Sequence, residues 1–516
     1  MKYSKKSLLS CKIWCWKFAA LAGFLMLTVS AAAQQVGTIV RVSSNMGEFD
    51  LGLYDSRTPK TVKNFLGYCQ RGEYQNSIFH RSVPGFVVQA GGFRLKGNSI
   101  DPVPSAGPVA NEPGVSNLRG TVAMAKLGGD PNSATNQWFI NLGNNAANLD
   151  KQNGGFAVFG KVLGNGMAVA YAIARLEVFN ASEALQSGAF GELPLRANQL
   201  TVPNLVMINA TRTLAPKSVA FEFDFSSGQQ GFVSGFADLP ANYKPADYTL
   251  DSGLRARPNP PGGGTALYIA GTNRSSDLWM FWKKKLTGLQ PNTVYDIVID
   301  LEFLSDVEKG SVGIGGSPGE SVSVKLGAAT LEPVVTSDNA GWLRLNADKG
   351  NQSTGGKNAL VVGNVAKPTG LAKGFATLQN STRGIKLRMN TDAAGALWIF
   401  FGTDSGFAGR TGIYYTRCAA ILEPIGKFQQ ISFSLPETVK FGASPLILNA
   451  TATSLAGVTF HSSNSTVAKV ENGRLLIAGV GETKITASQP GNATWAAAEQ
   501  VARRVRSQLP HLSRAM

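Results

Sequence analysis

Residues 79–93 read FHRSVPGFVVQAGGF, with one arginine, an apolar run and a closing pair of glycines. The alternation in this stretch predicts a strand that sends Phe79 and Arg81 to the same face. The Pro-Gly turn that follows folds the chain back and brings Phe86 and Gln89 beside the arginine. The stretch therefore predicts a fixed cation and an amide at the edge of an apolar patch. This combination suits the nitrogen of a prolyl peptide bond, a weakly basic atom in an apolar ring.

The same stretch resembles the signature segment of the cyclophilins, the cyclosporin-sensitive class of peptidyl-prolyl isomerases. Two further segments match that family in order and spacing, RGTVAMAKLGGDPNSATNQWFINL at 119–142 and FAVFGKV at 156–162. The resemblance covers roughly residues 36–212. It implies a mainly β fold, a closed eight-stranded antiparallel barrel capped by two helices. It also implies peptidyl-prolyl cis-trans isomerase activity on proline-containing polypeptides, without a cofactor or a metal ion.

The resemblance assigns roles to individual residues of this chain. It implies that Arg81 stabilises the twisted prolyl amide, and that the other catalytic positions are Phe86, Gln89 and Phe139. The substrate-binding positions that it implies are Val87, Ala125, Lys126, Gln137, Leu149 and Phe156. Among these, Ala125 and Lys126 hold the extended peptide through main-chain groups, and Gln137 supports the site from behind.

The chain departs from the family pattern at four positions. Many relatives have methionine in place of Val87, asparagine in place of Lys126, and histidine or tyrosine in place of Phe156. Asn148 stands where relatives carry tryptophan or another aromatic residue. This last change argues against tight cyclosporin binding but not against isomerisation.

Length and composition predict several mainly β domains. The 516 residues are too many for one core, and only 16% are charged while 58 are glycine. Part of the formal charge of +16 comes from lysines before residue 33, and no dense basic stripe remains after it. We therefore expect no nucleic-acid partner.

Residues 1–33 predict a secretory signal peptide. A lysine-rich start leads into an apolar run at 18–29 and then into Ala31-Ala32-Ala33, an A-x-A cleavage pattern. The apolar run is short for a membrane span. We expect an exported protein, periplasmic, secreted or on the cell surface, with no transmembrane anchor after cleavage.

Cysteine and histidine are scarce after the predicted leader. Cys69 and Cys418 are interpreted as two buried free thiols rather than a disulfide, because they lie far apart in different predicted domains. His80 is interpreted as structural and His461 as an exposed strand residue. Three histidines in the whole chain argue against a histidine-rich metal site.

Start and stop signals place two helices and a hairpin in the first domain. The hairpin turns at 45–47, and the first helix is capped by Thr58, starts at Pro59 and ends before Gly72. The second helix is predicted at 166–175, with Val169 and Ile173 on its inner face. The predicted domains are a barrel at 35–213, a jelly-roll-like β-sandwich at 217–424, an Ig-like β-sandwich at 430–505 and a disordered tail at 506–516. The segment VTFHSSNSTVAKVENGRLLIAGVGETKITASQPGN at 458–492 resembles bacterial Ig-like repeats, and this resemblance implies the Ig-like fold.

The sequence patterns of the two C-terminal domains predict their folds but not their function. Short alternating strands with regular turns are typical of sandwiches. Trp279, Trp282 and Trp398 are interpreted as core residues, with sugar stacking as the alternative. The stretch RRVRSQLPHLSRAM at 503–516 lacks alternation and is expected to fray.

Two functions remain open from the sequence. The leading hypothesis is an exported peptidyl-prolyl isomerase that assists folding, with sandwiches that set its location or partners. The alternative is a surface or polysaccharide-binding protein that contacts the cell envelope through the sandwiches, and whose barrel holds proline peptides without significant catalysis. The complete set of Arg81, Phe86, Gln89 and Phe139 favours catalysis.

Overall fold

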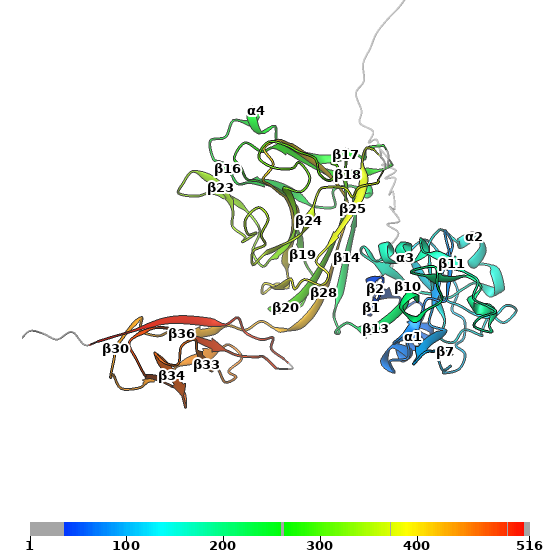
Figure 1. The fold of residues 1–516 in the computed structure, drawn as a ribbon, viewed down its shortest axis with the longest axis horizontal. Coiled ribbons are helices and arrows are strands. Elements are labelled where there is room, and N and C mark those ends of the chain that lie inside the picture. Colours follow the sequence, from blue (N-terminus) through cyan, green and yellow to red (C-terminus); the bar gives the residue numbers. More distant parts are fainter. Residues whose placement is uncertain (1–35, 260–262, 372, 493, 510–516) are drawn as a thin grey trace, which may run out of the picture. The chain divides into compact units, whose positions relative to one another are not determined.

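The computed structural model describes residues 36–259, 263–371, 373–492 and 494–509. The predicted signal peptide, and residues 510–516 of the predicted tail, lie outside the described residues. The chain is mainly β, as predicted, and forms three regions, each with a buried core of its own (Figure 1). None of the helices in the described ranges is long and apolar enough to cross a membrane.

The first region is built on one curled antiparallel sheet with the strand order β4-β5-β9-β8-β10-β2-β1-β13-β3-β6-β7. Its strands are β1 (Ile39–Ser44), β2 (Gly47–Leu53), β3 (Ser77–Ile78), β4 (Arg81–Val83), β5 (Val87–Ala90), β6 (Phe93–Lys96), β7 (Ser99–Pro102), β8 (Thr121–Met124), β9 (Trp138–Asn141), β10 (Val158–Leu163) and β13 (Met207–Thr213). A separate pair joins β11 (Glu177–Phe179) to β12 (Leu193–Leu195). The helices are α1 (Pro59–Gln70), α2 (Ala146–Leu149) and α3 (Gly166–Ala174).

The sheet closes because β3 and β4 are two halves of one bent strand. Only Phe79 and His80 separate them, and both main-chain N–H groups are used. Phe79 donates to Val206 O at 2.9 Å, towards β13, and His80 donates to Gln89 O at 3.1 Å, towards β5. Counted this way, the ring has eight members, and β6 and β7 branch from it. The predicted eight-stranded barrel is confirmed.

Because of the bend between β3 and β4, the prediction that Phe79 and Arg81 lie on the same face of one strand is wrong. Phe79 and Arg81 do not share a face. Phe79 is fully buried in the barrel core with its ring 6.0 Å from that of Trp138, whereas Arg81 lies on the other side of the sheet in register with Gln89. Alternation holds only along a continuous strand, and the strand is interrupted here.

Helix α1 begins at Pro59 and is followed by Gly72, as predicted, but its cap differs from the prediction. The side chain of Thr58 makes no capping hydrogen bond. Instead, the carboxylate of Glu112 accepts from the main-chain N–H groups of Lys60 at 3.2 Å and Thr61 at 2.8 Å. A residue 51 positions away from Thr61 therefore satisfies the free donors of the first turn.

Helix α3 begins at Gly166 and ends at Ala174, close to its predicted bounds. Ile173 is fully buried, as predicted, but Val169 is only half-buried. The inner face runs through Met167, Ala170 and Ile173 because these positions repeat every three residues.

The second region contains two facing antiparallel sheets. One has the order β17-β18-β28-β20-β25, with β14 on β28 and β26 on β20, and the other has the order β15-β19-β27-β21-β24. Its elements are β14 (Val219–Asp224), β15 (Val233–Ala237), β16 (Leu239–Pro240), α4 (Pro245–Tyr248), β17 (Asp251–Ala256), β18 (Thr265–Thr272), β19 (Leu278–Leu286), β20 (Thr293–Ser305), β21 (Val322–Ala329), β22 (Val335–Ser337), β23 (Trp342–Leu345), β24 (Ala359–Asn364), β25 (Ala376–Ser381), β26 (Arg388–Asn390), β27 (Leu397–Ser405) and β28 (Arg410–Lys427).

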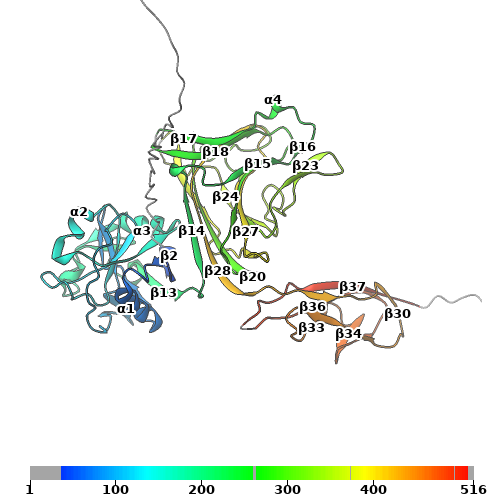
Figure 2. The same cartoon turned by 180° about the vertical axis from the view of Figure 1, so that it is seen from behind.

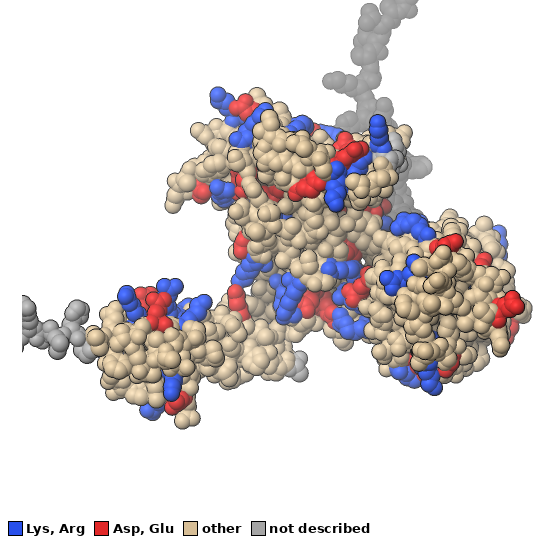
Figure 3. Space-filling model, viewed as in Figure 1, with Lys and Arg blue, Asp and Glu red and all other residues tan. Residues whose placement is uncertain are grey.

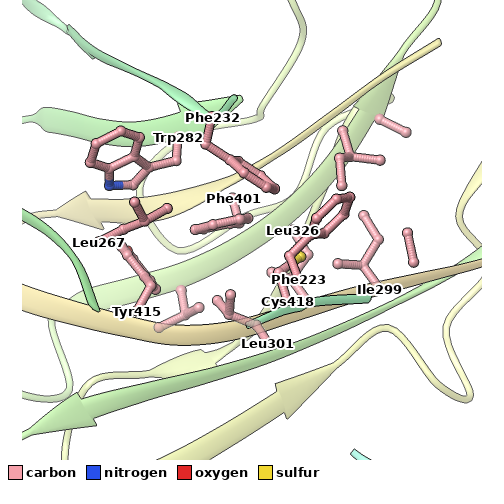
Figure 4. Close-up of a cluster of buried hydrophobic side chains, with 14 of the residues drawn as sticks. Phe223, Phe232, Leu267, Trp282, Ile299, Leu301, Leu326, Phe401, Tyr415 and Cys418 are labelled. Atoms are coloured by element: carbon pink, nitrogen blue, oxygen red, sulfur yellow. The ribbon is translucent and has the colours of Figure 1, made fainter. Parts of the chain in front are cut away.

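The core of the second region lies between these two sheets, as expected for a β-sandwich. Figure 4 shows side chains from both, among them Phe401 of β27 against Tyr415 of β28, with ring centres 4.9 Å apart. Cys418 lies in this core and Cys69 lies in the barrel core. Both are free thiols, as predicted.

The three tryptophans of the second region differ in exposure. Trp279 and Trp282 are buried, which confirms their interpretation as core residues. Trp398 is half-buried, and the ammonium group of Lys283 lies 5.4 Å from its ring centre. Sugar stacking is therefore left without support at two of the three positions.

The third region encloses a small core between short sheets, which fits a further β-sandwich. Its strands are β29 (Ile431–Phe433), β30 (Thr438–Lys440), β31 (Leu446–Ile447), β32 (Ala450–Ala452), β33 (Thr459–Ser462), β34 (Ala468–Glu471), β35 (Arg474–Ile477), β36 (Gly481–Ser488) and β37 (Val501–Gln508). His461 is exposed, as predicted.

The predicted fraying was wrong for residues 503–508, and so was a tail that starts at residue 506. These residues belong to β37, which pairs with β36 and β30. Val505 and Ser507 are buried while Arg504 and Arg506 are exposed, so the strand does alternate. The alternation is not evident in the sequence, because the arginines stand beside a buried position, Ser507, that carries a small polar residue in place of an apolar one.

Charged side chains are mixed on the face shown in Figure 3. Lysine and arginine lie among aspartate and glutamate, and neither sign forms a continuous stripe on that face.

Candidate active site

Three of the predicted catalytic residues lie in one row across neighbouring strands. Arg81 of β4 is directly opposite Gln89 of β5, and Gln89 is directly opposite Phe139 of β9. Paired residues point to the same side of an antiparallel sheet, about 5 Å apart at their Cβ atoms. The row therefore sets a guanidinium, an amide and an aromatic ring next to one another.

The guanidinium of Arg81 is held by a residue that the sequence did not indicate. Its Nε donates to Glu192 Oε2 at 2.6 Å, across 111 residues of sequence. The Arg81 side chain is 34% exposed and that of Glu192 is 44% exposed. An ion pair this exposed adds little stability, but it fixes the plane of the guanidinium. The terminal nitrogens of Arg81 have no hydrogen-bond partner among the described residues.

Gln89 is oriented by Gln137. Gln89 Nε2 donates to Gln137 Oε1 at 2.8 Å. Gln137 lies just before β9 and approaches the main chain at Gly92 so closely that a Cβ there would be 2.7 Å from its Cδ. The glycine at position 92 therefore leaves room for the supporting amide.

His80 is buried behind this pair and is 1% exposed. Its ring centre is 5.0 Å from that of Phe93. Burial lowers the pKa of His80 to about 4, and hydrogen bonds with the Ile78 main chain and the Gln137 amide offset that shift only in part. The imidazole is therefore neutral at physiological pH and supports Gln137, in line with the structural interpretation.

An apolar cluster lies beside the row and gathers the remaining predicted residues. Phe139 and Phe156 meet edge to face with ring centres 5.8 Å apart. Val87 and Leu149 are buried in the same cluster, whereas its partly exposed members are Phe86, Ala125, Phe156 and Val36. The partly exposed side chains form an accessible apolar surface of the kind that fits a proline ring.

Ala125 and Lys126 lie at the rim, but their contacts leave few groups for a substrate. The N–H of Ala125 already donates to Gln137 O at 2.9 Å. The ammonium of Lys126 donates to the carbonyls of Asn153 at 2.7 Å and Gly155 at 2.6 Å. It also lies 4.8 Å from the ring centre of Phe156. Lys126 therefore ties its side chain to the neighbouring loop, and a substrate contact there has to use main-chain groups.

The loop that carries Leu149 is fixed by Asp150. Ser116 Oγ donates to Asp150 Oδ2 at 2.5 Å, and the Asn117 N–H donates to Oδ1 at 2.8 Å. Burial acts to raise the pKa of Asp150, but these hydrogen bonds outweigh it and lower the pKa. Phe156 N–H donates to Leu149 O at 2.9 Å, so the same loop positions two residues of the apolar cluster.

The first region is similar to known proteins. The family model for cyclophilin-type peptidyl-prolyl cis-trans isomerases matches residues 39–188. The peptidyl-prolyl cis-trans isomerase of Acinetobacter baylyi is 38% identical over 163 residues, which are 31% of this chain and 82% of that protein. The peptidyl-prolyl cis-trans isomerase A of Dickeya dadantii is 42% identical over 170 residues, 31% of this chain and 85% of that protein.

The comparison with solved structures covers about a third of the chain. The crystal structure of a cyclophilin-type isomerase from Cryptosporidium parvum covers 35% of this chain and 98% of its own, at 23% identity and a TM-score of 0.26.

Proposed function

The chain belongs to the cyclophilin-type peptidyl-prolyl cis-trans isomerases through residues 39–188, and we propose that Arg81 is the residue that accelerates the reaction. The observation that carries this proposal is the row of Arg81, Gln89 and Phe139 beside the partly exposed apolar cluster. The predicted substrates are X-Pro bonds of polypeptides.

The chemistry required is small, because no bond is broken. Rotation about a peptide bond meets a barrier of ~18–20 kcal/mol, since twisting destroys amide resonance. In the twisted state the proline nitrogen regains a lone pair and accepts a hydrogen bond, which it cannot do when planar. A donor aimed at that nitrogen binds the transition state more tightly than the substrate, and this difference is what lowers the barrier.

Each element of the site has one task in this proposal. The apolar cluster around Phe139 holds the proline ring. The Gln89 amide, fixed by Gln137, contacts the substrate backbone. Glu192 accepts the hydrogen bond from Nε of Arg81. The terminal nitrogens of Arg81 are thereby left to donate to the twisted amide. Since these donors are already oriented, the site needs no rearrangement at the moment of rotation.

Export completes the proposal. The lysine-rich start, the apolar run and the Ala31-Ala32-Ala33 pattern support a cleaved signal peptide, so that the substrates are proteins outside the cytoplasm. The mass of the exported chain tests this. Cleavage after Ala33 is the expected result, and a chain that keeps its first 33 residues inside the cell contradicts it.

The experiment that tests Arg81 compares the full-length protein with Arg81→Ala and Arg81→Lys in the isomerisation of a short Ala-Pro peptide. Losing one preorganised electrostatic contact is expected to lower kcat/KM on the order of 10²–10³-fold. Lysine is expected to recover little, because an ammonium group lacks the planar fork and the Nε contact with Glu192.

Arg57→Ala is the matched control, since Arg57 is an exposed arginine of the same region. It is expected to keep full activity. An Arg81→Ala protein that is folded and as fast as wild type would remove Arg81 from the mechanism. The alternative of a polysaccharide-binding protein is not proposed, because two of its three candidate tryptophans are buried in the core.

A further inference from the structure

A group of buried charges in the second region has no part in prolyl isomerisation. Lys325 of β21 and Asp404 of β27 have side chains with no exposed surface, and Lys325 Nζ lies 2.7 Å from Asp404 Oδ2. The two strands are adjacent and antiparallel, with Ser323 opposite Asp404, so Lys325 is the diagonal neighbour of Asp404 on the same face. Asp277 adjoins them from the residue before β19, the strand on the other side of β27.

We propose that Lys325 and Asp404 condense to form an intramolecular isopeptide bond that joins β21 to β27, with Asp277 as the proton carrier. The amine and the carboxyl group are already in contact, and the third carboxyl group borders the one that would react.

The two lysines next to Asp404 are not equivalent. Lys349 Nζ bridges two carboxylates, at 2.8 Å from Asp238 Oδ2 and 2.7 Å from Asp404 Oδ2. Lys325 contacts a single carboxylate, and its second acceptor is the Lys349 carbonyl at 3.0 Å. Two negative partners hold Lys349 in its charged form, and its pKa is raised despite burial. Burial lowers the pKa of Lys325, because one carboxylate does not offset the loss of water. Lys325 is therefore the lysine that can become a neutral nucleophile.

Asp277 is suited to carry the proton. Burial, followed by contact with the Asp404 carboxyl group, raises its pKa to about 8. Oδ1 of Asp277 and Oδ1 of Asp404 are both buried, and neither accepts a hydrogen bond from the described residues. One shared proton between these carboxyl groups satisfies both atoms and removes their mutual repulsion.

The reaction balances without any other reagent. The buried pair first exchanges a proton, so that Lys325 is an amine and Asp404 an acid. Lys325 Nζ then forms a bond to Cγ of Asp404 while Asp277 gives its proton to Oδ1 of Asp404. Asp277 next takes the surplus proton from Nζ and passes it to the other oxygen on Cγ, which leaves as water when the Cγ–O bond breaks. As the carbonyl forms again, its hydroxyl proton returns to Asp277. One ammonium and one carboxylate become one secondary amide and one water, and Asp277 ends as it began.

The surroundings favour this conversion. Two buried charges carry a large desolvation penalty, and a neutral amide avoids it. Trp279 lies opposite Asp404 in the strand ladder and stacks on Phe281, which keeps one side of the site apolar. On the other side, a pocket of about 400 Å³ reaches Asp277 and Lys349 and lets the water leave.

A metal ion fits the same residues less well. Asp238, Asp277 and Asp404 bring oxygens within 4.8 Å of one another, as a cation site requires. However, the ammonium of Lys349 already lies between Asp238 and Asp404, and that of Lys325 lies against Asp404. A metal ion would have to displace both.

Intact-mass spectrometry of the purified full-length chain tests the proposal. The wild type is expected to be lighter than its sequence by one water, ~18 Da, and a protease digest is expected to yield one branched peptide joining Lys325 to Asp404. Lys325→Arg keeps the ion pair but removes the amine, and it is expected to have the full sequence mass. Asp277→Asn, which keeps the shape but not the acid, is expected to remain unlinked.

Lys349→Arg is the matched control, since it preserves the charge beside Asp404 and leaves Lys325 in place. It is expected to lose the same water as the wild type. A folded wild type with the full sequence mass after prolonged incubation would overturn the proposal. So would a branched peptide through Lys349, or a water loss that persists in Lys325→Arg.

Discussion

Arg81 reaches its position through two independent contacts, the strand register opposite Gln89 and the ion pair with Glu192. The register sets where the side chain leaves the sheet, and the ion pair sets the plane of the guanidinium. Because a donor works only when aimed at the proline nitrogen, the second contact matters for rate even though it adds little stability.

Glu192 is therefore predicted to be a positioning residue. Glu192→Ala is expected to lower kcat on the order of tenfold with little change in KM, because the guanidinium loses its orientation but the apolar cluster keeps its substrate. Glu192→Gln is expected to recover most of the rate, since its amide oxygen still accepts from Nε. Steady-state kinetics of both variants check this. An unchanged kcat in Glu192→Ala would show that the register alone is enough.

His80 gives the first region an acid-sensitive stability. Its pKa is about 4 in the folded chain and 6.5 in the unfolded chain, so the folded state binds fewer protons between these values. The free energy of unfolding is therefore independent of His80 titration above pH 6.5. It falls as the pH drops towards 4, by about 3 kcal/mol in total. His80→Gln is expected to reduce this loss, as measured by urea unfolding at pH 7 and pH 4. Equal pH dependence in both proteins would contradict the buried neutral imidazole.

The residues of the site differ in how far the sequence alone could predict them. Arg81, Gln89 and Phe139 belong to short segments whose order is characteristic, and the strand ladder brings them together. Glu192 lies in none of these segments and is joined to Arg81 only by the folded path of the chain. Contacts of this kind depend on tertiary placement, so no local pattern indicates them.

Helix α1 illustrates the same limit for an element. Its start and its glycine stop follow from local chemistry, and both were predicted. The cap was not, because the acceptor is Glu112 in a distant loop instead of Thr58. The strands β3 and β4 add a second case, since period-2 alternation does not tell where a barrel strand bends.

Glu112 is predicted to carry the capping energy of α1. Glu112→Ala is expected to destabilise the chain by about 1 kcal/mol, the usual effect of a lost N-cap acceptor. Glu112→Gln retains an acceptor oxygen and is expected to lose less, mainly the attraction between the carboxylate and the helix dipole. Denaturant unfolding of the two variants separates these effects. A neutral Glu112→Ala would mean that water caps the helix equally well.

For the whole molecule, the isomerase site is contained in the first region. Its catalytic and substrate-binding residues lie between Arg81 and Glu192, and Val36 at the edge of the apolar cluster belongs to the same region. The two relatives are matched over 82% and 85% of their length. Residues 34–213 alone are therefore expected to isomerise an Ala-Pro peptide with the kcat/KM of the full chain. A folded but slow fragment would show that the second region contributes to catalysis.

The long strand β28 has a mechanical consequence for the second region. It pairs with β14, β18 and β20, and β20 runs beside it over most of its length (Figures 1 and 2). The chain enters this region beside the end of β28, because Val219 at the start of β14 is opposite Leu422. A pull between the two chain ends of the region therefore acts on adjacent ends of one antiparallel pair. Its ladder hydrogen bonds lie along the force and open one after another. β14 is thus the strand that tension detaches from the central sandwich first.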